Sequence, residues 1–408
     1  MKLIVKNLNV IKSGVIELNG ITVLAGKNGT GKSTIGKSLY CLGRAFYHAD
    51  EKVHDEIERQ LFMIFRNSAA HVIGKSRRVI SQASLTRMIE SFDSTGDVLL
   101  PKEYLDAKPT VIEQKEIEEK VRIVLSIDPL QVLTGLLART LQTELGENVN
   151  PVNNPRRTTH IDLKLMDNEL LSVSINKGEQ PVIQTKRAIE KDIIYIDDPY
   201  VLDTLSTMAG FQQVLSRFSH RADLEERLLK VQDDNSVIND ILAEQNWKEI
   251  IELIDELSEG DVVRGKSEDF LYQSPAFKEP LSIRSLSMGL KSILLLKTLL
   301  KNGSLNNTGL LIFDEPEIHL HPEMQFGLAK ILVLIPKILG IKIMLSTHST
   351  DFLSAINYYS NENGLTEVTK YYQLKKEGDY SIVRDVTGDI DVLYEELSSP
   401  FLQVVEKL

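Results

Sequence analysis

The chain has 408 residues, enough for roughly two or three domains, or for one domain with large insertions, around a sizeable buried core. Its formal net charge of −11 argues against a generally basic protein that coats nucleic acid, although a local basic patch stays open. The single cysteine, Cys41, excludes an intrachain disulfide and favours a reducing compartment. No stretch reaches the apolar length that a bilayer span needs, so we expect a cytoplasmic protein without a membrane segment.

The N-terminal part contains a phosphate-binding motif between a strand and a helix. Residues 1–24 predict two or three short strands, with turn signals at Lys12-Ser13-Gly14 and Asn19-Gly20. The stretch Gly26-Lys27-Asn28-Gly29-Thr30-Gly31-Lys32-Ser33 then matches G-x-x-x-x-G-K-[ST], the phosphate-binding loop. Residues 20–25 predict a buried strand before it, and residues 34–44 predict a helix after it. This context makes an ordinary glycine-rich turn the weaker interpretation.

The residue types of this loop suit phosphate chemistry. Glycines let the backbone curl until successive N–H groups face a phosphate, and the following helix adds the positive end of its dipole. Lys32 would reach the β- and γ-phosphates, and the Ser33 hydroxyl would ligate Mg²⁺. The sequence therefore predicts a site for ATP and Mg²⁺. Its expected nucleotide-binding residues are Asn28, Gly29, Thr30, Gly31, Lys32, Ser33 and Thr34.

Two helical segments interrupt the strand-like parts of the chain. Residues 46–150 carry apolar side chains at three- and four-residue steps, such as Val53, Ile57 and Leu61, and predict a helical insertion. Its acidic run at 113–119 fits a solvated helix face better than a metal cluster. Strand-like alternation resumes in residues 156–200, and residues 200–258 predict a helical subdomain. The nucleotide-binding head is thus expected to comprise residues 1–45, 156–200 and 260–408.

Two carboxylates end a continuous apolar run at residues 310–316. This pattern is typical of a buried parallel strand with chemistry at its carboxyl end. Hydrolysis of ATP needs a metal near the β- and γ-oxygens and a water in line with the leaving group. We assign Asp314 to Mg²⁺ and Glu315 to the water. Glu317 competes for the role of base, but it ranks second because it lies beyond Pro316, away from the strand edge.

Residues 341–345 predict the next strand, and a histidine follows its end within Ser346-Thr347-His348-Ser349. From that position His348 could reach the γ-phosphate and sense its presence, although a structural histidine at a strand end remains the alternative.

Two other stretches have both a structural and a functional interpretation. Ser287 precedes an apolar helix and fits an N-cap, and the same geometry leaves free N–H groups that bind an anion. His319 and His321 could suggest zinc, but no cysteine or third histidine accompanies them, so we expect them to shape the loop beside the site.

These stretches together resemble a known family. The phosphate loop, Leu286-Ser287-Met288-Gly289, Phe313-Asp314-Glu315-Pro316-Glu317-Ile318-His319-Leu320-His321-Pro322 and Ser346-Thr347-His348-Ser349 resemble the ABC-type ATPase heads of the OLD, RecF and SMC group. The DEPEIHLHP stretch is similar to OLD-like ATPases of bacterial anti-phage defence systems, including the Septu, Gabija and PARIS types. The resemblance covers residues 1–44 and the region from residue 193 onward, its helical insert excepted.

The resemblance implies an α/β fold of the P-loop NTPase class. It implies an ABC-type head with a mostly parallel central sheet, an antiparallel β part and helical insertions. Ser287 and Gly289 would contact the γ-phosphate bound to the opposite subunit, His348 would be the switch histidine, and two heads would sandwich two ATP molecules. The expected activity is hydrolysis of ATP to ADP and phosphate, with Glu315, His348 and Lys32 as catalytic residues.

The chain departs from the family pattern in three places. Its signature is Leu-Ser-Met-Gly-Leu-Lys instead of Leu-Ser-Gly-Gly-Gln. No glutamine can be assigned to the loop that usually contacts Mg²⁺, since Gln60 and Gln82 both fall in helical patterns. Because the chain ends soon after the head, we expect no Toprim nuclease domain.

Three functions remain in competition at this point. The preferred hypothesis is an ATPase that dimerises on ATP and controls a separate effector protein, a nuclease or toxin, in anti-phage defence. The alternative is a DNA-repair ATPase of RecF or SMC type that clamps DNA directly. The nucleotide-binding subunit of an ABC transporter is a weaker third hypothesis, because the helical insertions and DEPEIHLHP do not suit that group.

Overall fold

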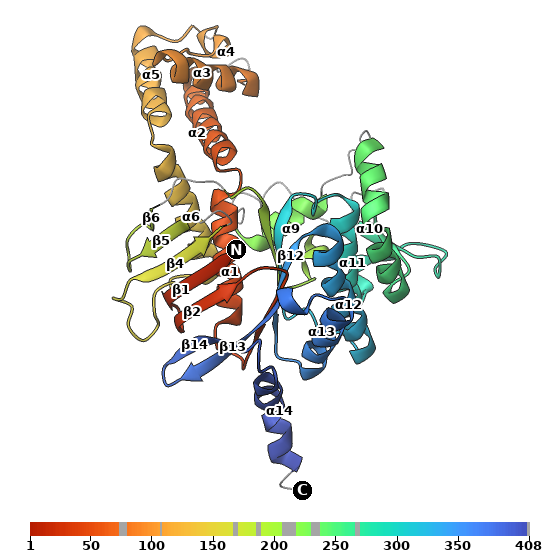
Figure 1. Cartoon of the computed structure of the whole chain (residues 1–408). Coiled ribbons are helices and arrows are strands. Elements are labelled where there is room, and N and C mark those ends of the chain that lie inside the picture. Colours follow the sequence, from red (N-terminus) through yellow and green to blue (C-terminus); the bar gives the residue numbers. More distant parts are fainter. Residues whose placement is uncertain are drawn as a thin grey trace. The chain divides into compact units, whose positions relative to one another are not determined.

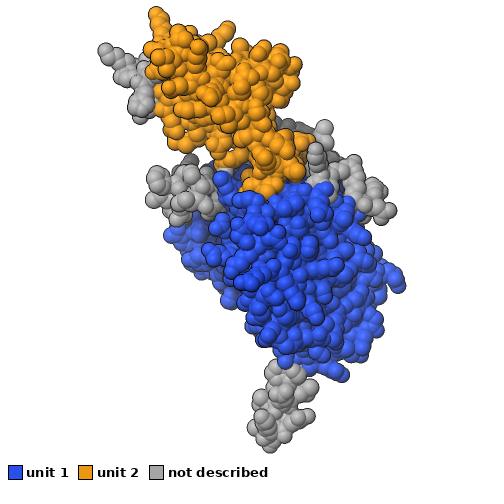
Figure 2. All heavy atoms as spheres, turned by 90° about the vertical axis from the view of Figure 1, so that its left-hand side faces the viewer, with its two compact units in different colours: residues 1–47, 137–408 blue, residues 48–136 orange. Residues whose placement is uncertain are grey.

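The computed structural model describes residues 1–72, 80–106, 108–165, 170–184, 189–205, 218–229, 237–265 and 270–405. The chain divides into two compact units (Figure 2): unit 1 is Met1–Tyr47 with Leu137–Leu408, and unit 2 is His48–Leu136. Unit 2 is shorter than the helical insertion expected at 46–150, because the end of α6 (Pro129–Leu145) is hydrogen-bonded into unit 1 through Glu144 and His220. The helical subdomain expected at 200–258 belongs to unit 1, and its residues 206–217 and 230–236 lie outside the described ranges.

Unit 1 is built around a mixed sheet whose strand order is β6-β5-β4-β1-β2-β14-β13-β3-β12-β11-β7. Figure 1 labels the strands from β6 to β13 of this order. Strands β13, β3, β12, β11 and β7 run parallel to one another, whereas β1, β2, β4, β5 and β6 form an antiparallel part. The predicted fold class is therefore confirmed. The strands are β1 (Lys2–Leu8), β2 (Ile11–Glu17), β3 (Ile21–Ala25), β4 (Thr159–Lys164), β5 (Leu170–Ile175), β6 (Val182–Ile183), β7 (Asp192–Ile196), β11 (Thr308–Asp314), β12 (Lys342–Thr347), β13 (Thr369–Glu377) and β14 (Tyr380–Asp385).

Helices cover both faces of the parallel strands, which is why these strands are apolar throughout. On one face α1 (Lys32–Phe46) packs so closely that a Cβ on Gly36 would lie 3.2 Å from Ile312 and 3.3 Å from Met344. On the other face Leu311 and Phe313 enter the main core. Helices of that core and its surroundings are α7 (Val201–Thr204), α9 (His220–Leu229), α10 (Val237–Leu257), α11 (Met288–Lys301), α12 (Pro322–Leu339), α13 (Thr350–Glu362) and α14 (Asp391–Val405). The carboxyl ends of β3, β12, β11 and β7 thus meet at one edge between the two helical layers.

The strand-like pattern after residue 260 forms a separate antiparallel sheet. It contains β8 (Asp261–Arg264), β9 (Phe270–Gln273) and β10 (Leu281–Ser282). The chain then reaches α11, whose N-cap is Ser287, as its sequence predicts; the Ser287 side chain accepts a hydrogen bond from the Leu290 N–H.

The expected terminal hairpin is present, but it lies inside the sheet. Strands β13 and β14 pair antiparallel with each other, β13 lies parallel beside β3, and β14 lies parallel beside β2. The C-terminal segment thereby joins the antiparallel part of the sheet to the strand that precedes the phosphate loop.

Unit 2 is helical and has a core of its own. Its helices are α2 (Ala49–Val72), α3 (Gln82–Thr95), α4 (Lys102–Leu105), α5 (Val111–Leu125) and the beginning of α6. Leu61, Phe65, Met88 and Val121 are almost fully buried in that core. Among the described helices, none is by itself long and apolar enough to cross a membrane; α5 and α6 meet that test together, but they are bent by 76° at their junction.

Candidate nucleotide-binding site

The phosphate loop lies between β3 and α1, as predicted, and it needs its glycines for two reasons. Gly26, Gly29 and Gly31 have φ angles of 154°, 75° and 99°, which other residues adopt rarely. A Cβ on Gly26 would lie 2.5 Å from the carbonyl oxygen of Leu374 on β13, and one on Gly31 would lie 2.8 Å from Ile11 Cγ1. The loop therefore has both left-handed backbone and close neighbours at its first and last glycine.

The side chains of the loop fold back onto its own carbonyls. Lys32 Nζ donates hydrogen bonds to the carbonyl oxygens of Gly26 at 2.8 Å and Lys27 at 3.4 Å. Thr30 Oγ1 also donates to the Lys27 carbonyl oxygen, at 2.8 Å. Asn28, Gly29 and Ser33 are exposed, while Lys32 is buried. These contacts hold the lysine ammonium within the curl of the loop, where a phosphate would be bound.

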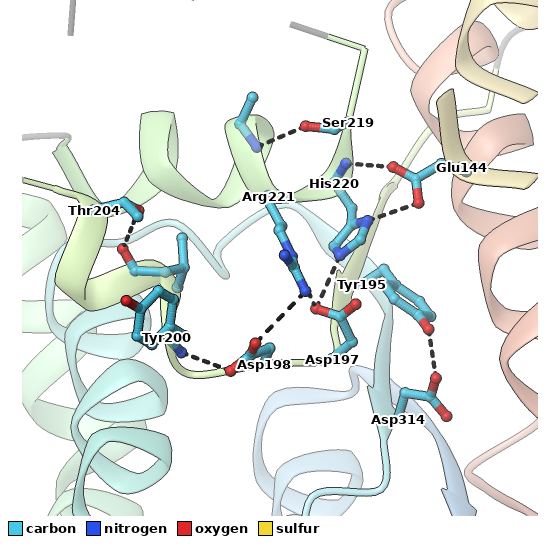
Figure 3. Close-up of polar contacts among 12 residues, drawn as sticks. Glu144, Tyr195, Asp197, Asp198, Tyr200, Thr204, Ser219, His220, Arg221 and Asp314 are labelled. Carbon is cyan, nitrogen blue, oxygen red and sulfur yellow. Dashed lines mark hydrogen bonds and ion pairs between the residues drawn. The ribbon is translucent and has the colours of Figure 1, made fainter. Parts of the chain in front are cut away.

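Asp314, at the end of β11, is held between hydroxyl groups of the two neighbouring strands. Ser346 on β12 donates to Oδ1, and Tyr195 on β7 donates to Oδ2 at 2.6 Å (Figure 3). Burial and the charge of Asp314 raise the pKa of the Tyr195 hydroxyl well above its usual value, so Tyr195 remains a donor. The carboxylate is thus fixed in rotation from both sides.

Glu315 is in contact with both other predicted catalytic residues. Its Oε1 lies 3.6 Å from Lys32 Nζ and 3.2 Å from His348 Nδ1. Its backbone is in the left-handed region, with φ of 54°, and its N–H donates to the carbonyl oxygen of Ser346 at 3.0 Å. The structure therefore brings Lys32, Glu315 and His348 together at the carboxyl ends of three adjacent strands.

Glu317, the second candidate for the base, is buried and contacts the segment that carries His348. It is 4% exposed, and its Oε1 accepts hydrogen bonds from Thr347 Oγ1 and from the His348 backbone N–H. Burial raises the pKa of Glu317 above its usual value, against these hydrogen bonds, which lower it. The two glutamates thus have different environments: Glu315 faces Lys32, and Glu317 fixes the segment that carries His348.

The signature residues lie beside the loop that follows β11. A Cβ on Gly289 would lie 2.8 Å from the carbonyl oxygen of His319, so only glycine permits this approach of α11 to the loop. Ser287 is exposed at the start of α11. Within the described ranges, no hydrogen bond or ion pair joins Ser287 or Gly289 to the phosphate loop of the same chain.

His319 and His321 lie in the loop after β11 and at the N-cap of α12, and both are exposed. His319 has a φ of 70°, so it forms part of a sharp turn. In the part of the chain that the structure describes, no group of three or more His, Cys, Asp or Glu side chains is placed to hold a metal ion.

The carboxyl end of β7 lies beside the site, although the sequence assigns no role to its residues Asp197 and Asp198. Because β7 runs parallel beside β11, Asp197 and Asp198 lie at the same sheet edge as Asp314. A cleft with a volume of about 360 Å³ is lined by Asp197, Asp198, Arg221, Asp314 and Glu315 together with the start of α11. The signal was available, since an apolar strand that ends in Asp-Asp is the same pattern that singled out Asp314.

Buried His220 connects the end of β7 to the end of α6. Its Nδ1 lies 2.7 Å from Glu144 Oε2, and its Nε2 lies 2.9 Å from Asp197 Oδ1 (Figure 3). Arg221 adds ion pairs to Asp197 at 3.7 Å and to Asp198 at 3.5 Å. Burial alone would lower the pKa of His220, but hydrogen bonds to Asp197 and Glu144 outweigh it and raise that pKa.

The glutamines considered for the metal-contacting loop have other partners. Gln60 and Gln82 lie in α2 and α3 of unit 2, where their amides donate to Glu56 and Glu58.

The donor set at the edge of the sheet suits a magnesium ion. Asp314 offers a carboxylate held by two hydroxyls, and Ser33 offers an exposed hydroxyl in the first turn of α1. Hard oxygen donors of this kind are those that Mg²⁺ prefers, and it commonly takes only one or two of them from a protein. The residues present therefore fit the metal.

Comparisons with solved structures find SMC heads of low sequence identity. The SMC head bound to the C-winged helix domain of ScpA is 13% identical with a TM-score of 0.48, and the match covers 96% of this chain and 98% of that one. The SMC head domain from Thermotoga maritima is 11% identical with a TM-score of 0.41, and the match covers 94% and 98%. The SMC head from Pyrococcus furiosus with an extended coiled coil is 13% identical with a TM-score of 0.44, covering 97% and 98%.

A family model matches most of the chain. No curated protein sequence matches the chain. The model of the AAA ATPase domain matches residues 1–353, which include the phosphate loop, Asp314, Glu315 and His348. Because this match spans most of the chain, the protein belongs to the AAA ATPase domain family.

Proposed function

We propose that the chain binds ATP with Mg²⁺ and hydrolyses it to ADP and phosphate. The observation that carries this proposal is the contact of Glu315 with both Lys32 and His348 beside the phosphate loop. A cation, a carboxylate and a histidine at one sheet edge supply charge neutralisation, a base and a phosphate contact.

Each residue has a distinct role in the proposed reaction. Lys32 and the backbone N–H groups of the loop neutralise the phosphates. Glu315 accepts the proton of a water that attacks the γ-phosphorus, while the bond from that phosphorus to the bridging oxygen breaks and ADP leaves. His348 holds Glu315 and contacts the γ-phosphate. Asp314 and Ser33 would hold Mg²⁺, which would supply charge stabilisation to the phosphates.

The two glutamates provide a matched test of this mechanism. Glu315→Gln should lower the rate of hydrolysis by roughly 100-fold or more, because a base is lost, while ATP binding is retained. Glu317→Gln should keep the rate within about tenfold, because the amide oxygen can still accept hydrogen bonds from Thr347 and His348. Phosphate release and nucleotide binding are measured for both variants. Equal rates for Glu315→Gln and the wild type would contradict the mechanism.

We further propose that two copies form a dimer around two ATP molecules. Ser287 is exposed and is not bonded to the phosphate loop of its own chain, which supports a contact with the nucleotide of a second copy. In light scattering, Glu315→Gln with ATP should have twice the mass of the monomer. The double variant Glu315→Gln with Ser287→Arg, in which a large cationic side chain replaces the small N-cap serine of α11, should remain monomeric while still binding ATP.

The proposed role of this ATPase in the cytoplasm is control of a separate effector protein, a nuclease or toxin, in anti-phage defence. It is supported by the similarity of the stretch from Asp314 to Pro322 to OLD-like ATPases. Purification from the native host, with and without ATP, should yield a stoichiometric effector. Recovery of a lone dimer with ATP-dependent, salt-sensitive DNA binding would instead support a clamp of RecF or SMC type.

A further inference from the structure

Tyr195 contacts the proposed metal carboxylate from the strand next to β11. The Tyr195 hydroxyl is 2.6 Å from Asp314 Oδ2, and the tyrosine residue as a whole is 1% exposed. We propose that Tyr195 is a positioning residue, which fixes the orientation of Asp314 for Mg²⁺. This inference rests on the proposed function, since it assumes that Asp314 serves the metal.

The ring of Tyr195 is held on several sides, so its hydroxyl has a defined position. A Cβ on Gly36 of α1 would lie 2.8 Å from Tyr195 Cε2, which means that the ring packs directly against the helix backbone. The rings of His220 and Tyr40 lie 4.9 Å and 6.4 Å away, between centroids. Lys37 Nζ lies 6.0 Å from the ring centroid. The glycine one turn after Lys32 thus makes room for the tyrosine.

The arrangement around Asp314 explains why the hydroxyl matters. Ser346 and Tyr195 each donate to a different carboxylate oxygen, from strands on opposite sides of β11. With both donors present, rotation about the terminal bond of Asp314 is blocked, and the remaining lone pairs have fixed directions. With Ser346 alone, Oδ2 would have no fixed direction. Such supporting contacts commonly change metal affinity by roughly 10- to 100-fold.

Metal-dependent nucleotide binding separates this role from a packing role. Binding of a fluorescent ATP analogue to the full chain is measured in EDTA and then as a function of Mg²⁺ concentration. For Tyr195→Phe, the Mg²⁺ concentration that gives half of the metal-dependent change in nucleotide binding should rise by roughly 10-fold or more. The affinity for the nucleotide in EDTA should be unchanged. Tyr40→Phe is the matched control, because it removes a neighbouring buried hydroxyl that has no hydrogen-bond partner among the residues that the structure describes. It should leave both quantities unchanged.

Two further variants make the outcome decisive. Gly36→Ala should raise the Mg²⁺ requirement as well, because the new methyl group displaces the ring without removing the hydroxyl. Asp314→Asn should abolish the metal effect. Suppose that Asp314→Asn abolishes the effect of Mg²⁺ on nucleotide binding. The positioning role of Tyr195 is then wrong, and the proposed function stands, if Tyr195→Phe has the Mg²⁺ dependence of the wild type. The same conclusion follows if Tyr195→Phe loses as much nucleotide affinity in EDTA as it does with Mg²⁺. If Asp314→Asn has no effect on the Mg²⁺ dependence, the assumed role of Asp314 is wrong instead.

Discussion

At the level of single residues, the backbone of Glu315 shows how the site is assembled. A non-glycine residue in the left-handed region costs roughly 1–3 kcal/mol and persists only where its surroundings enforce it. Here the Glu315 N–H is held by the carbonyl oxygen of Ser346, one strand away. The turn directs Glu315 toward Lys32 and leaves Glu317 buried behind it. The strain is thus part of the geometry that makes the two glutamates different.

The first glycine of the phosphate loop gives a prediction at the same scale. Gly26→Ala should abolish ATP binding and lower the free energy of unfolding by roughly 1–3 kcal/mol, because its φ is 154° and the new Cβ would lie 2.5 Å from a carbonyl oxygen. Nucleotide titration and urea denaturation measure the two effects. Gly146→Ala is the control: its φ is also positive, at 63°, but among the described residues no atom beyond its immediate chain surroundings lies within 4 Å of the added Cβ. ATP binding by Gly26→Ala at wild-type affinity would contradict this account.

Much of the site could be predicted from the sequence, because its residues belong to contiguous stretches of characteristic spacing. The phosphate loop, Asp314, Glu315 and His348 are of this kind. The preference for Glu315 over Glu317 rested only on position. The positive φ of Glu315 and the bonds of Glu317 to Thr347 and His348 are differences between the two glutamates that no local pattern predicts, and the role of Glu315 stays a proposal. The contact of Tyr195 with Asp314 could not be predicted, since it depends on which strand lies beside β11.

At the level of elements, His220 joins three parts of unit 1. Its ring lies between Glu144 at the end of α6 and Asp197 at the end of β7, while its own backbone begins α9. Both oxygens of Glu144 are engaged, because Oε1 accepts from the His220 N–H. An imidazole between two carboxylates therefore fixes the end of the strand that carries Tyr195.

Replacement of this histidine should have a pH-dependent effect on stability. Since the folded state raises the pKa of His220, its stabilising contribution is complete below its ordinary pKa of about 6.5 and is lost as pH rises through the folded-state value. His220→Gln should therefore lower the free energy of unfolding most at low pH. The difference in that free energy from the wild type should shrink toward alkaline pH. Urea denaturation at a series of pH values measures this. His321→Gln, at an exposed N-cap whose side chain makes no cap hydrogen bond, should show no such trend. A loss of stability on His220→Gln that grows as pH rises would contradict a raised pKa of His220 in the folded state.

The order of the strands was less predictable than their existence. Hydrophobic periodicity depends on local sequence, so β3, β11 and β12 and the terminal hairpin were expected near their observed positions. The insertion of β13 and β14 between β3 and β2 depends on contacts between distant parts of the chain, which no local pattern encodes. The same holds for the separate sheet of β8, β9 and β10.

At the level of the whole molecule, each unit has its own buried core, so their stabilities should be separable. Leu61→Ala should lower the stability of unit 2 by about 2–5 kcal/mol, because Leu61 is 0% exposed in that core. Hydrogen exchange should accelerate in α2, α3 and α5 and stay unchanged in β11 and β12. Leu99→Ala, at a leucine of the same unit that is 57% exposed, should leave both regions unchanged. Equal acceleration in both units would show that they unfold as one.

The position of β13 also has a consequence for synthesis of the protein. Strand β3 pairs with β12 and β13, and the first glycine of the phosphate loop rests against Leu374. All of these partners are translated long after β3, and at about 5–20 residues per second the delay amounts to roughly tens of seconds. During that time the nascent chain presents β2 and β3 as unpaired edges, which other chains could join. We therefore expect the loop to acquire its support only after most of the head has been synthesised, which would make nucleotide binding one of the last steps of folding.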